Sequence, residues 1–163
     1  MQTKTYKDSE AILSEMLLPY QANTLGNIHG GEIMKLMDST AGIAAMKYSG
    51  KDAVTARVDE LQFKQPVHVG AHIICKAHVV YTGRTSMEVF VTVENEDIKT
   101  GRKTVALTAF FTMVAVDENG RPTPVPPIEF SREPYIRLLY FEGQRRYDAH
   151  RHMSRKRGKD GRK

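Results

Sequence analysis

Three consecutive segments in the middle of the chain alternate apolar and polar side chains, and this pattern restricts the fold more than any other feature. Successive side chains of a strand point to opposite faces of a sheet, so the alternation predicts half-buried β-strands. The connection Thr82–Arg84 is short enough for a hairpin, which favours antiparallel pairing. The predicted apolar faces are Ile73, Cys75, Ala77, Val79 and Tyr81; Met87, Val89, Val91 and Val93; and Val105, Leu107, Ala109, Phe111, Met113 and Ala115.

A long, almost entirely apolar segment precedes these strands and predicts a buried helix. The segment opens at Gly30 and Gly31 and runs to about Tyr48. Its apolar residues cover more of the helix than a single stripe, so we expect it to be buried on most sides. Gly50 is the expected C-cap.

Three further elements complete the predicted order. Ser9–Pro19 and Val54–Phe63 are predicted as strands, and the alternation of the second slips near Asp59, which indicates a bulge. A last helix is expected over Arg132–His150. One strand, a long helix, four strands and a peripheral helix predict an α+β fold, in which a five-stranded antiparallel sheet has a helix packed across it.

The second faces of the predicted strands are also rich in apolar side chains. These residues are Ile74, Val80, Phe90, Phe110 and Val114. Because a helix on the first face leaves them uncovered, and a monomer rarely exposes so much apolar surface, we expect an oligomer.

The formal net charge of +5 is unevenly distributed along the 163 residues. Residues 144–163 hold nine Lys or Arg and two acids, whereas residues 1–143 carry slightly more acidic than basic groups. We therefore expect one domain over 1–143, then a basic helix end and an unstructured tail over 144–163. A solubilising end is the favoured interpretation of the tail, and specific nucleic-acid binding is the alternative.

The composition, 40% hydrophobic and 26% charged, is ordinary for a soluble globular protein. The first ten residues lack the apolar core of a signal peptide. The apolar segment Ile33–Met46 is too short, and too charged through Lys35 and Asp38, to span a bilayer. A single cysteine, Cys75, excludes an internal disulfide. These features predict a cytoplasmic protein.

Several catalytic motifs are absent from the sequence. It contains no G-x-S-x-G elbow, no G-x-x-x-x-G-K-[ST] phosphate loop and no H-E-x-x-H motif. The six histidines do not fall at metal-ligand spacings, so no metal is expected. His72 and His78 are expected on a polar strand face, solvated or locally bonded, and Cys75 is expected in the core.

One carboxylate, Asp38, interrupts the apolar helix. Aspartate has poor helix propensity and is costly to bury without partners. A surface ion pair with Lys35 is the structural alternative. An acid among apolar neighbours favours a general base or nucleophile in a cleft. The helix start after "GNIHGG" offers unpaired amides, at Gly30 and Gly31, that suit a developing oxyanion.

The spacing of these groups predicts a dimer. Gly31 and Asp38 lie roughly 10 Å apart along one helix, at 1.5 Å per residue, so one carbonyl cannot contact both. If both act on one carbon, the amides come from one subunit and Asp38 from another. Two such helices must then lie side by side and antiparallel across a two-fold axis.

The stretch Asn23–Gly31, which reads N-x-x-G-N-x-H-G-G, and the helix that follows resemble the acyl-CoA thioesterases of the hotdog superfamily. The resemblance continues in "VTARVDELQFKQPVHVG", "TGRTSMEV" and "TAFFTMVAVDENGRPTPVPP", and covers roughly residues 9–128. It implies a hotdog fold, with the sheet wrapped around the long helix. It also implies hydrolysis of fatty acyl-CoA to fatty acid and coenzyme A, no cofactor, and double-hotdog dimers assembled as a homohexamer.

The resemblance also implies roles for individual residues. Asp38 corresponds to the catalytic acid, as base or nucleophile, and Asn23 to the catalytic Asn, supplied by the neighbouring subunit. The Gly30 and Gly31 amides would polarise the thioester carbonyl. The candidate CoA contacts are His29, Arg84, Thr85, Ser86, Arg57 and Lys64.

Three alternatives stay open at this point. A hotdog hydratase would want an Asp–His pair, but no His follows Asp38 before His68. A non-catalytic acyl-CoA binder would not need both Asn23 and Asp38. Nucleic-acid binding through the tail is the third. The sequence does not indicate acyl-chain preference or nucleotide regulation.

Overall fold

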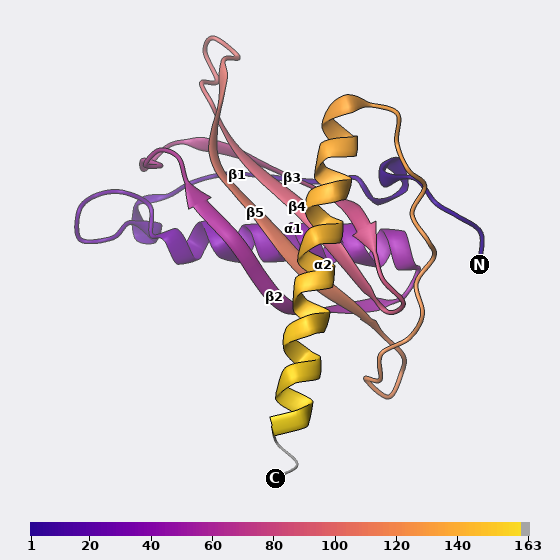
Figure 1. The fold of residues 1–163 in the computed structure, drawn as a ribbon. Helices are drawn as coiled ribbons and strands as arrows, with labels where there is room; N and C mark the ends of the chain where they lie inside the picture. The colour runs from indigo at the N-terminus through magenta and orange to yellow at the C-terminus, as the bar shows by residue number, and fades with distance from the viewer. Residues whose placement is uncertain (161–163) are drawn as a thin grey trace.

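The computed structural model of the protein describes residues 1–160, with side chains described through residue 152. Five antiparallel strands form one sheet in the order β1-β3-β4-β5-β2. One long helix, α1, packs on one face, and a second, α2, crosses the other (Figure 1). This arrangement confirms the predicted α+β hotdog architecture. The bounds are β1 Ala11–Met16, α1 Gly30–Ser49, β2 Asp52–Phe63, β3 His72–Thr82, β4 Ser86–Glu96, β5 Lys103–Val116 and α2 Pro134–Asp160, with short 3₁₀ turns at Tyr6–Ser9 and Pro19–Gln21.

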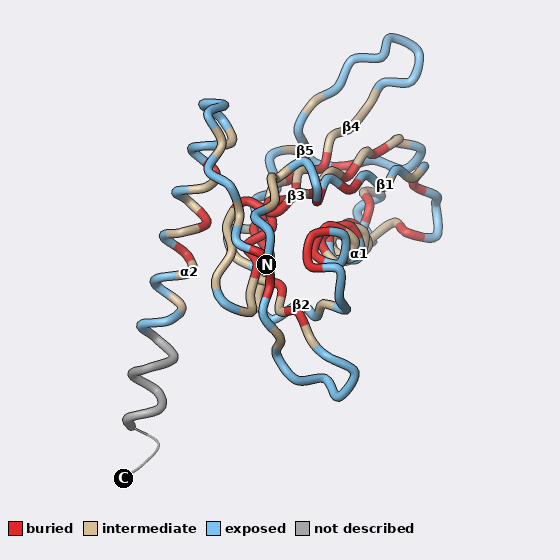
Figure 2. Tube along the Cα trace, turned by 90° about the vertical axis from the view of Figure 1, so that its right-hand side faces the viewer, coloured by how far each residue is buried: buried red, intermediate tan, exposed pale blue. Residues whose placement is uncertain are grey.

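The inner layer is an apolar core between α1 and the sheet. Figure 2 shows α1 end-on against the buried face of the strands, away from α2. Met37, Ala41, Ala44 and Tyr48 are fully buried there, and the alanines let the helix lie close to the strands. Gly50 adopts a left-handed conformation with φ of 68°, and its N–H donates to the Met46 carbonyl, which confirms the predicted C-cap.

Bulges correct the predicted strand faces at two positions. A register shift between Val79 and Tyr81 turns Tyr81 to the outer face, where its ring meets α2. A second shift, between Val93 and Glu94, leaves Val105 40% exposed and puts Ala106 into the core instead. Both predictions were wrong because strict alternation carries no sign of an inserted residue.

The outer face is covered by α2 rather than left bare. Val80, Phe90 and Phe110 pack with Leu139 in a second, smaller apolar cluster. Gly143 lies so close to the sheet that a Cβ there would come within 2.9 Å of the Tyr81 Cβ. Much of the surface that predicted an oligomer is therefore buried within the chain, and the oligomer needs other evidence.

The second helix is longer than predicted, since α2 continues past His150 to Asp160. The predicted boundary at Gly143 falls inside this helix, and residues 161–163 lie outside the described chain. The unstructured tail stays a prediction. None of the helices in the described part of the chain is long and apolar enough to cross a membrane.

Candidate active site

The loop before α1 holds Asn23 in a fixed position. The Asn23 Oδ1 accepts hydrogen bonds from the N–H groups of Leu25 (2.9 Å) and Asn27 (3.2 Å). The Asn23 N–H donates to the Asn27 carbonyl at 2.7 Å, which closes the turn. The side-chain amide nitrogen makes no hydrogen bond within the described part of the chain. Asn23 therefore keeps two N–H donors for a ligand.

The start of α1 is shaped by two contacts. His29 is the N-cap, and its Nδ1 accepts a 3.0 Å hydrogen bond from the Gly31 N–H. The Phe63 ring lies against Gly30, where a Cβ would come within 2.9 Å of it. Only glycine fits at this position without displacing the ring. With the Gly31 amide engaged by His29 in this structure, Gly30 is the better placed of the two predicted oxyanion donors.

The acid on α1 is held from the neighbouring strand. The Thr55 Oγ1 donates a 2.6 Å hydrogen bond to the Asp38 Oδ1. The Asp38 side chain is otherwise exposed to solvent, and it forms no ion pair with Lys35 within the described residues. The surface ion pair considered from the sequence is therefore not formed. A carboxylate fixed by one oxygen keeps the other free to accept a proton or attack a carbonyl.

These contacts form two separate groups along α1. Asn23, His29 and Gly30 lie at its N-terminal end, and Asp38 and Thr55 lie two turns further on. Seven residues of helix between Gly31 and Asp38 correspond to roughly 10 Å. A single chain therefore presents two separate groups of candidate site residues.

The turn between β3 and β4 is fixed by backbone bonds. The Gly83 N–H donates to the Ser86 carbonyl, the Ala115 N–H to the Thr85 carbonyl, and the Val125 N–H to the Arg84 carbonyl, all at 2.9–3.0 Å. The Tyr147 ring of α2 covers Gly83. Arg84 itself is exposed, so its guanidinium is available to an anion.

The other two predicted CoA contacts lie elsewhere. Lys64 is exposed just after β2. Arg57 pairs in register with Thr112 on the outer side of the sheet, near Glu88 and His150. Arg57 therefore belongs to the face under α2 and not to the face that carries Asp38.

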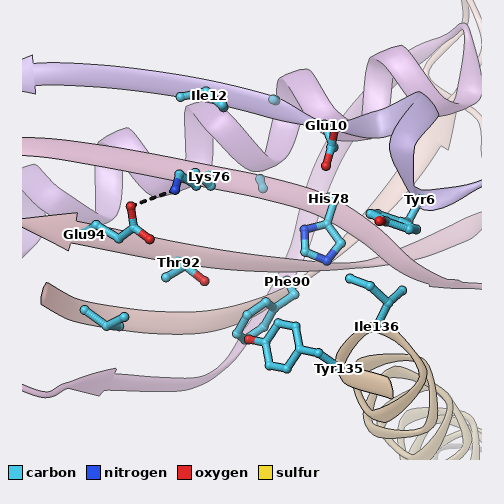
Figure 3. Close-up of a pocket in the computed structure, with 13 residues that line it drawn as sticks. Tyr6, Glu10, Ile12, Lys76, His78, Phe90, Thr92, Glu94, Tyr135 and Ile136 are labelled. Atoms are coloured by element: carbon cyan, nitrogen blue, oxygen red, sulfur yellow. Dashed lines mark hydrogen bonds and ion pairs between the residues drawn. The ribbon is translucent and has the colours of Figure 1, made fainter. Parts of the chain in front are cut away.

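A cleft of about 430 Å³ opens on the outer face, beside the N-terminal end of α2 (Figure 3). His78 lies in it between Tyr6 and Phe90, whose rings it meets edge-on. The His78 Nε2 is buried and has no hydrogen-bond partner in the described part of the chain, and burial lowers the pKa of His78 to about 4. The prediction of a solvated or locally bonded His78 was wrong, because the 3₁₀ turn Tyr6–Ser9 and α2 cover that strand face. The cleft contains none of the predicted site residues.

His72 and Cys75 agree with their predicted roles. His72 Nδ1 lies 2.8 Å from the Glu96 carboxylate, a local partner on the adjacent strand. Cys75 is fully buried, and burial raises the pKa of its thiol to about 11. Its thiol is therefore protonated and unreactive near neutral pH. The described residues contain no cluster of three or more His, Cys, Asp or Glu side chains that could hold a metal ion.

Thr55 and Phe63 are site residues that the sequence reasoning missed. Both lie on the inner face of β2, in register with Met113 and Leu107. A hydroxyl among apolar inner-face residues was a signal that could have singled out Thr55. Phe63 gave no comparable signal, because an aromatic residue on a strand usually belongs to the core.

Comparisons with known proteins agree with this geometry. The family model of the thioesterase superfamily matches residues 25–102. An uncharacterized acyl-CoA thioester hydrolase of Bacillus subtilis, YkhA, is 34% identical over 137 residues, which cover 84% of this chain and 80% of that protein. The structure of a hexameric acyl-CoA thioesterase has a TM-score of 0.87 at 36% identity, covering 94% of this chain and 98% of that one.

An acyl-CoA hydrolase from Staphylococcus aureus, solved with butyryl coenzyme A and coenzyme A, is similarly close. Its TM-score is 0.86 at 27% identity, and it covers 99% of this chain and 100% of that one. Similarity in sequence and in fold extends over nearly the whole domain. The chain therefore belongs to the hotdog-fold thioesterase superfamily and is an acyl-CoA hydrolase.

Proposed function

We propose that the protein hydrolyses fatty acyl-CoA thioesters to free fatty acid and CoA. Asp38 is the catalytic carboxylate, acting as base or nucleophile, and Asn23 is supplied by the neighbouring subunit. The Asp38 carboxylate, exposed but fixed by Thr55, is the observation that carries the proposal. Asp38 either takes a proton from the attacking water or attacks the thioester carbon itself. In both routes the C–S bond breaks, the acyl carbon gains one water oxygen, and the CoA thiolate takes a proton.

Variants of the Staphylococcus aureus hydrolase support this choice of residues. That protein has been solved with one Asp, one Asn and one Thr each replaced by Ala. The three positions are separated by the same intervals as Asn23, Asp38 and Thr55, including the step of 17 positions from Asp38 to Thr55. The equal spacing supports the choice of Asn23, Asp38 and Thr55 as site residues.

The free edge of β2 supports a shared site. β2 pairs only with β5 among the described strands, so its other edge is open. Val54 is 51% exposed and Phe63 54% exposed along this strand. Pairing two β2 edges across a two-fold axis would cover them and bring the two α1 helices together antiparallel. Related thioesterases that have been solved are hexameric, so we propose a dimer built this way within a hexamer.

Binding of the CoA part is assigned to the β3–β4 turn. The exposed Arg84 guanidinium would pair with a CoA phosphate, with Thr85 and Ser86 as further contacts. His29 and Lys64 are the remaining exposed candidates. Rat, mouse and human proteins that are 32% identical are cytosolic acyl-CoA thioester hydrolases, and the chain spans 38% of their length. We propose a cytosolic location here too.

The first experiment tests the acid. Wild type, Asp38→Ala, Asp38→Asn and the control Asp148→Asn, an exposed acid on α2, are incubated with acyl-CoA from acetyl to palmitoyl. Released CoA is measured with a thiol reagent. We expect wild type and the control to release CoA, and both Asp38 variants to lose at least about a hundredfold in kcat. Full activity in Asp38→Ala would remove the acid from the mechanism.

The second experiment tests the shared site. Asn23→Ala and Asp38→Ala chains are unfolded, mixed in equal amounts and refolded. Half of the dimers should be mixed, each with one intact site, so activity should recover to about a quarter of wild type by random pairing. Absence of recovery with both variants folded would place the site within one chain.

A further inference from the structure

A buried cluster of charged and polar groups lies between α2 and the outer face of the sheet. Glu88 of β4 is 1% exposed and accepts a hydrogen bond from the Thr112 Oγ1, which lies 3.1 Å from both carboxylate oxygens. Arg146 of α2 is 4% exposed, and its guanidinium lies 3.7 Å from the centre of the Phe110 ring. Burying these charges is costly without partners, so the cluster needs a structural or functional reason.

Two side chains of α2 reach from this cluster to consecutive residues of β2. Arg146 forms an ion pair with the Glu60 carboxylate through Nη2. Its Nη1 donates to the Glu142 carboxylate and carbonyl, each at 2.9 Å, which orients the guanidinium. One turn later, His150 Nε2 lies 2.9 Å from Asp59 Oδ2. Asp59 and Glu60 are therefore held from α2 at two points.

Asp59 and Glu60 lie at one of the two bulges of β2, the one referred to here as the β2 bulge. The register with β5 shifts between Asp59 and Gln62, and Glu60 has a φ of 50°, the only positive φ of a non-glycine residue in the described chain. A left-handed conformation at such a residue is strained and persists only where its surroundings hold it. The two contacts from α2 supply that restraint.

The bulge lies between the two points where β2 contacts the site on α1. On one side Thr55 donates to Asp38, and on the other Phe63 packs against Gly30. Both residues pair with inner-face residues of β5, whereas Asp59 pairs with Phe110 of the outer face. A further register shift, between Thr55 and Arg57, inserts another residue. Each inserted residue reverses the face, so Thr55 and Phe63 face inward at the two ends while Arg57 and Asp59 face outward between them.

We propose that Arg146 and Glu60, supported by His150 and Asp59, position the acid: by fixing the β2 bulge from the outer face, they hold Thr55 where it orients Asp38. They are positioning residues, since none of them contacts Asp38. This inference rests on the proposed function of Asp38. Small displacements of a catalytic group lower turnover strongly, so loosening the bulge is expected to reduce kcat more than it changes KM.

The test uses the full chain and substitutions that keep side-chain size. Glu60→Gln removes one charge of the pair at a partly exposed position, and Arg146→Met removes the other. Glu133→Gln is the matched control, because this exposed glutamate is also ion-paired, to Lys7, but far from the bulge in the sequence. Each variant is assayed for CoA release well below its melting temperature, with circular dichroism confirming that it is folded.

We expect kcat to fall about fivefold to tenfold in Glu60→Gln and Arg146→Met, with KM within about twofold of wild type and no change in Glu133→Gln. Unchanged kcat in folded Glu60→Gln would overturn the proposal. Glu60→Gln replaces a single side-chain oxygen by nitrogen and keeps the shape of the side chain. This variant alone therefore tests the proposal if Arg146→Met does not fold.

A double-mutant cycle with Thr55→Val separates positioning from a general structural effect. If the bulge acts through Thr55, Glu60→Gln should lower kcat less than about twofold in the Thr55→Val background. Independent, multiplying losses would overturn the route through Thr55. Asp38→Asn distinguishes the two proposals. If Asp38→Asn keeps its activity, the catalytic assignment fails. If Asp38→Asn is inactive but Glu60→Gln has the kcat of wild type, only the positioning role is refuted.

Discussion

The two helices of the protein are held to the same sheet in different ways. α1 packs on the inner face through a large apolar core, in which Met37, Ala41 and Ala44 are fully buried. α2 packs on the outer face through a smaller apolar cluster, ring contacts with Tyr81 and a set of ion pairs centred on Arg146. The inner layer therefore depends on apolar area, and the outer layer depends on charges and their protonation.

The two layers therefore contribute differently to the free energy of unfolding and to its dependence on pH and salt. Apolar burial changes little with pH or salt, so the core under α1 sets most of the free energy of unfolding. Charged groups between α2 and the sheet respond to both, and they contact the strand that carries Thr55. Substitutions on the inner face are expected to change the free energy of unfolding most, and those on the outer face to change its dependence on conditions.

The largest effect is expected from truncating the inner core. Phe111→Ala removes a side chain that is 1% exposed and leaves a cavity, so it should lower the free energy of unfolding by about 3–5 kcal/mol. Urea unfolding measures the loss. A change below about 1 kcal/mol would show that the inner layer does not dominate stability.

The next effect is pH-dependent and belongs to the outer face. Burial raises the pKa of Glu88 to about 7, so the folded protein binds this proton more tightly than the unfolded chain does. Wild type therefore loses stability as pH rises from about 4.5 to about 7. Glu88→Gln, which stays neutral and can still bond Thr112, should be more stable than wild type by about 2 kcal/mol at pH 8.

The difference in the free energy of unfolding between Glu88→Gln and wild type should become smaller as the pH is lowered to 5. Thermal unfolding of both proteins at the two pH values measures it. An equal difference at pH 5 and pH 8 would mean that Glu88 does not titrate in this range.

A smaller effect is expected where α2 touches the sheet. At Gly143 a Cβ would lie 2.9 Å from Tyr81 Cβ and 3.1 Å from Val80 Cγ2, so Gly143→Ala must push α2 outward. Despite the better helix propensity of alanine, we expect a net loss of about 1–2 kcal/mol in chemical unfolding. A gain in stability would show that α2 is free to move away from the sheet.

The smallest effect is expected at an exposed ion pair of the outer layer. Lys7 Nζ and Glu133 Oε1 lie 3.7 Å apart, with both side chains more than half exposed. Glu133→Gln should change the free energy of unfolding by less than about 0.5 kcal/mol. A loss as large as that of Gly143→Ala would indicate that surface pairs, and not only buried ones, hold α2.

The sequence predicted the elements whose residues repeat regularly. The α1 helix and its glycine cap, the antiparallel strands, and the bulge near Asp59 are all confirmed, because each has a local pattern. The outward turn of Tyr81 was not predicted, because strict alternation gives no sign of the register shift that causes it. The burial of His78 was not predicted either, since it depends on the Tyr6–Ser9 turn and on α2, which lie far away in the sequence.

The candidate site was predictable where a residue type is unusual for its place in the sequence. An acid in an apolar helix and a Gly-rich helix start singled out Asp38 and Gly30. The partners that fix them, Thr55 and Phe63, come from β2, and only the observed register places them against α1. Arg57 was predicted for CoA, but the register shift between Thr55 and Arg57 puts it on the outer face beside Glu88.

The link between the β2 bulge and α2 has a consequence for synthesis. Glu60 leaves the ribosome long before Arg146 and His150. All strands of the sheet and α1 are therefore synthesised before the residues of α2 that contact the bulge. A nascent chain that ends before Arg146 would already contain Asn23, Asp38 and Thr55. Its β2 bulge would lack the contacts from α2, and by the proposal above its turnover would reach the full value only when α2 has been made.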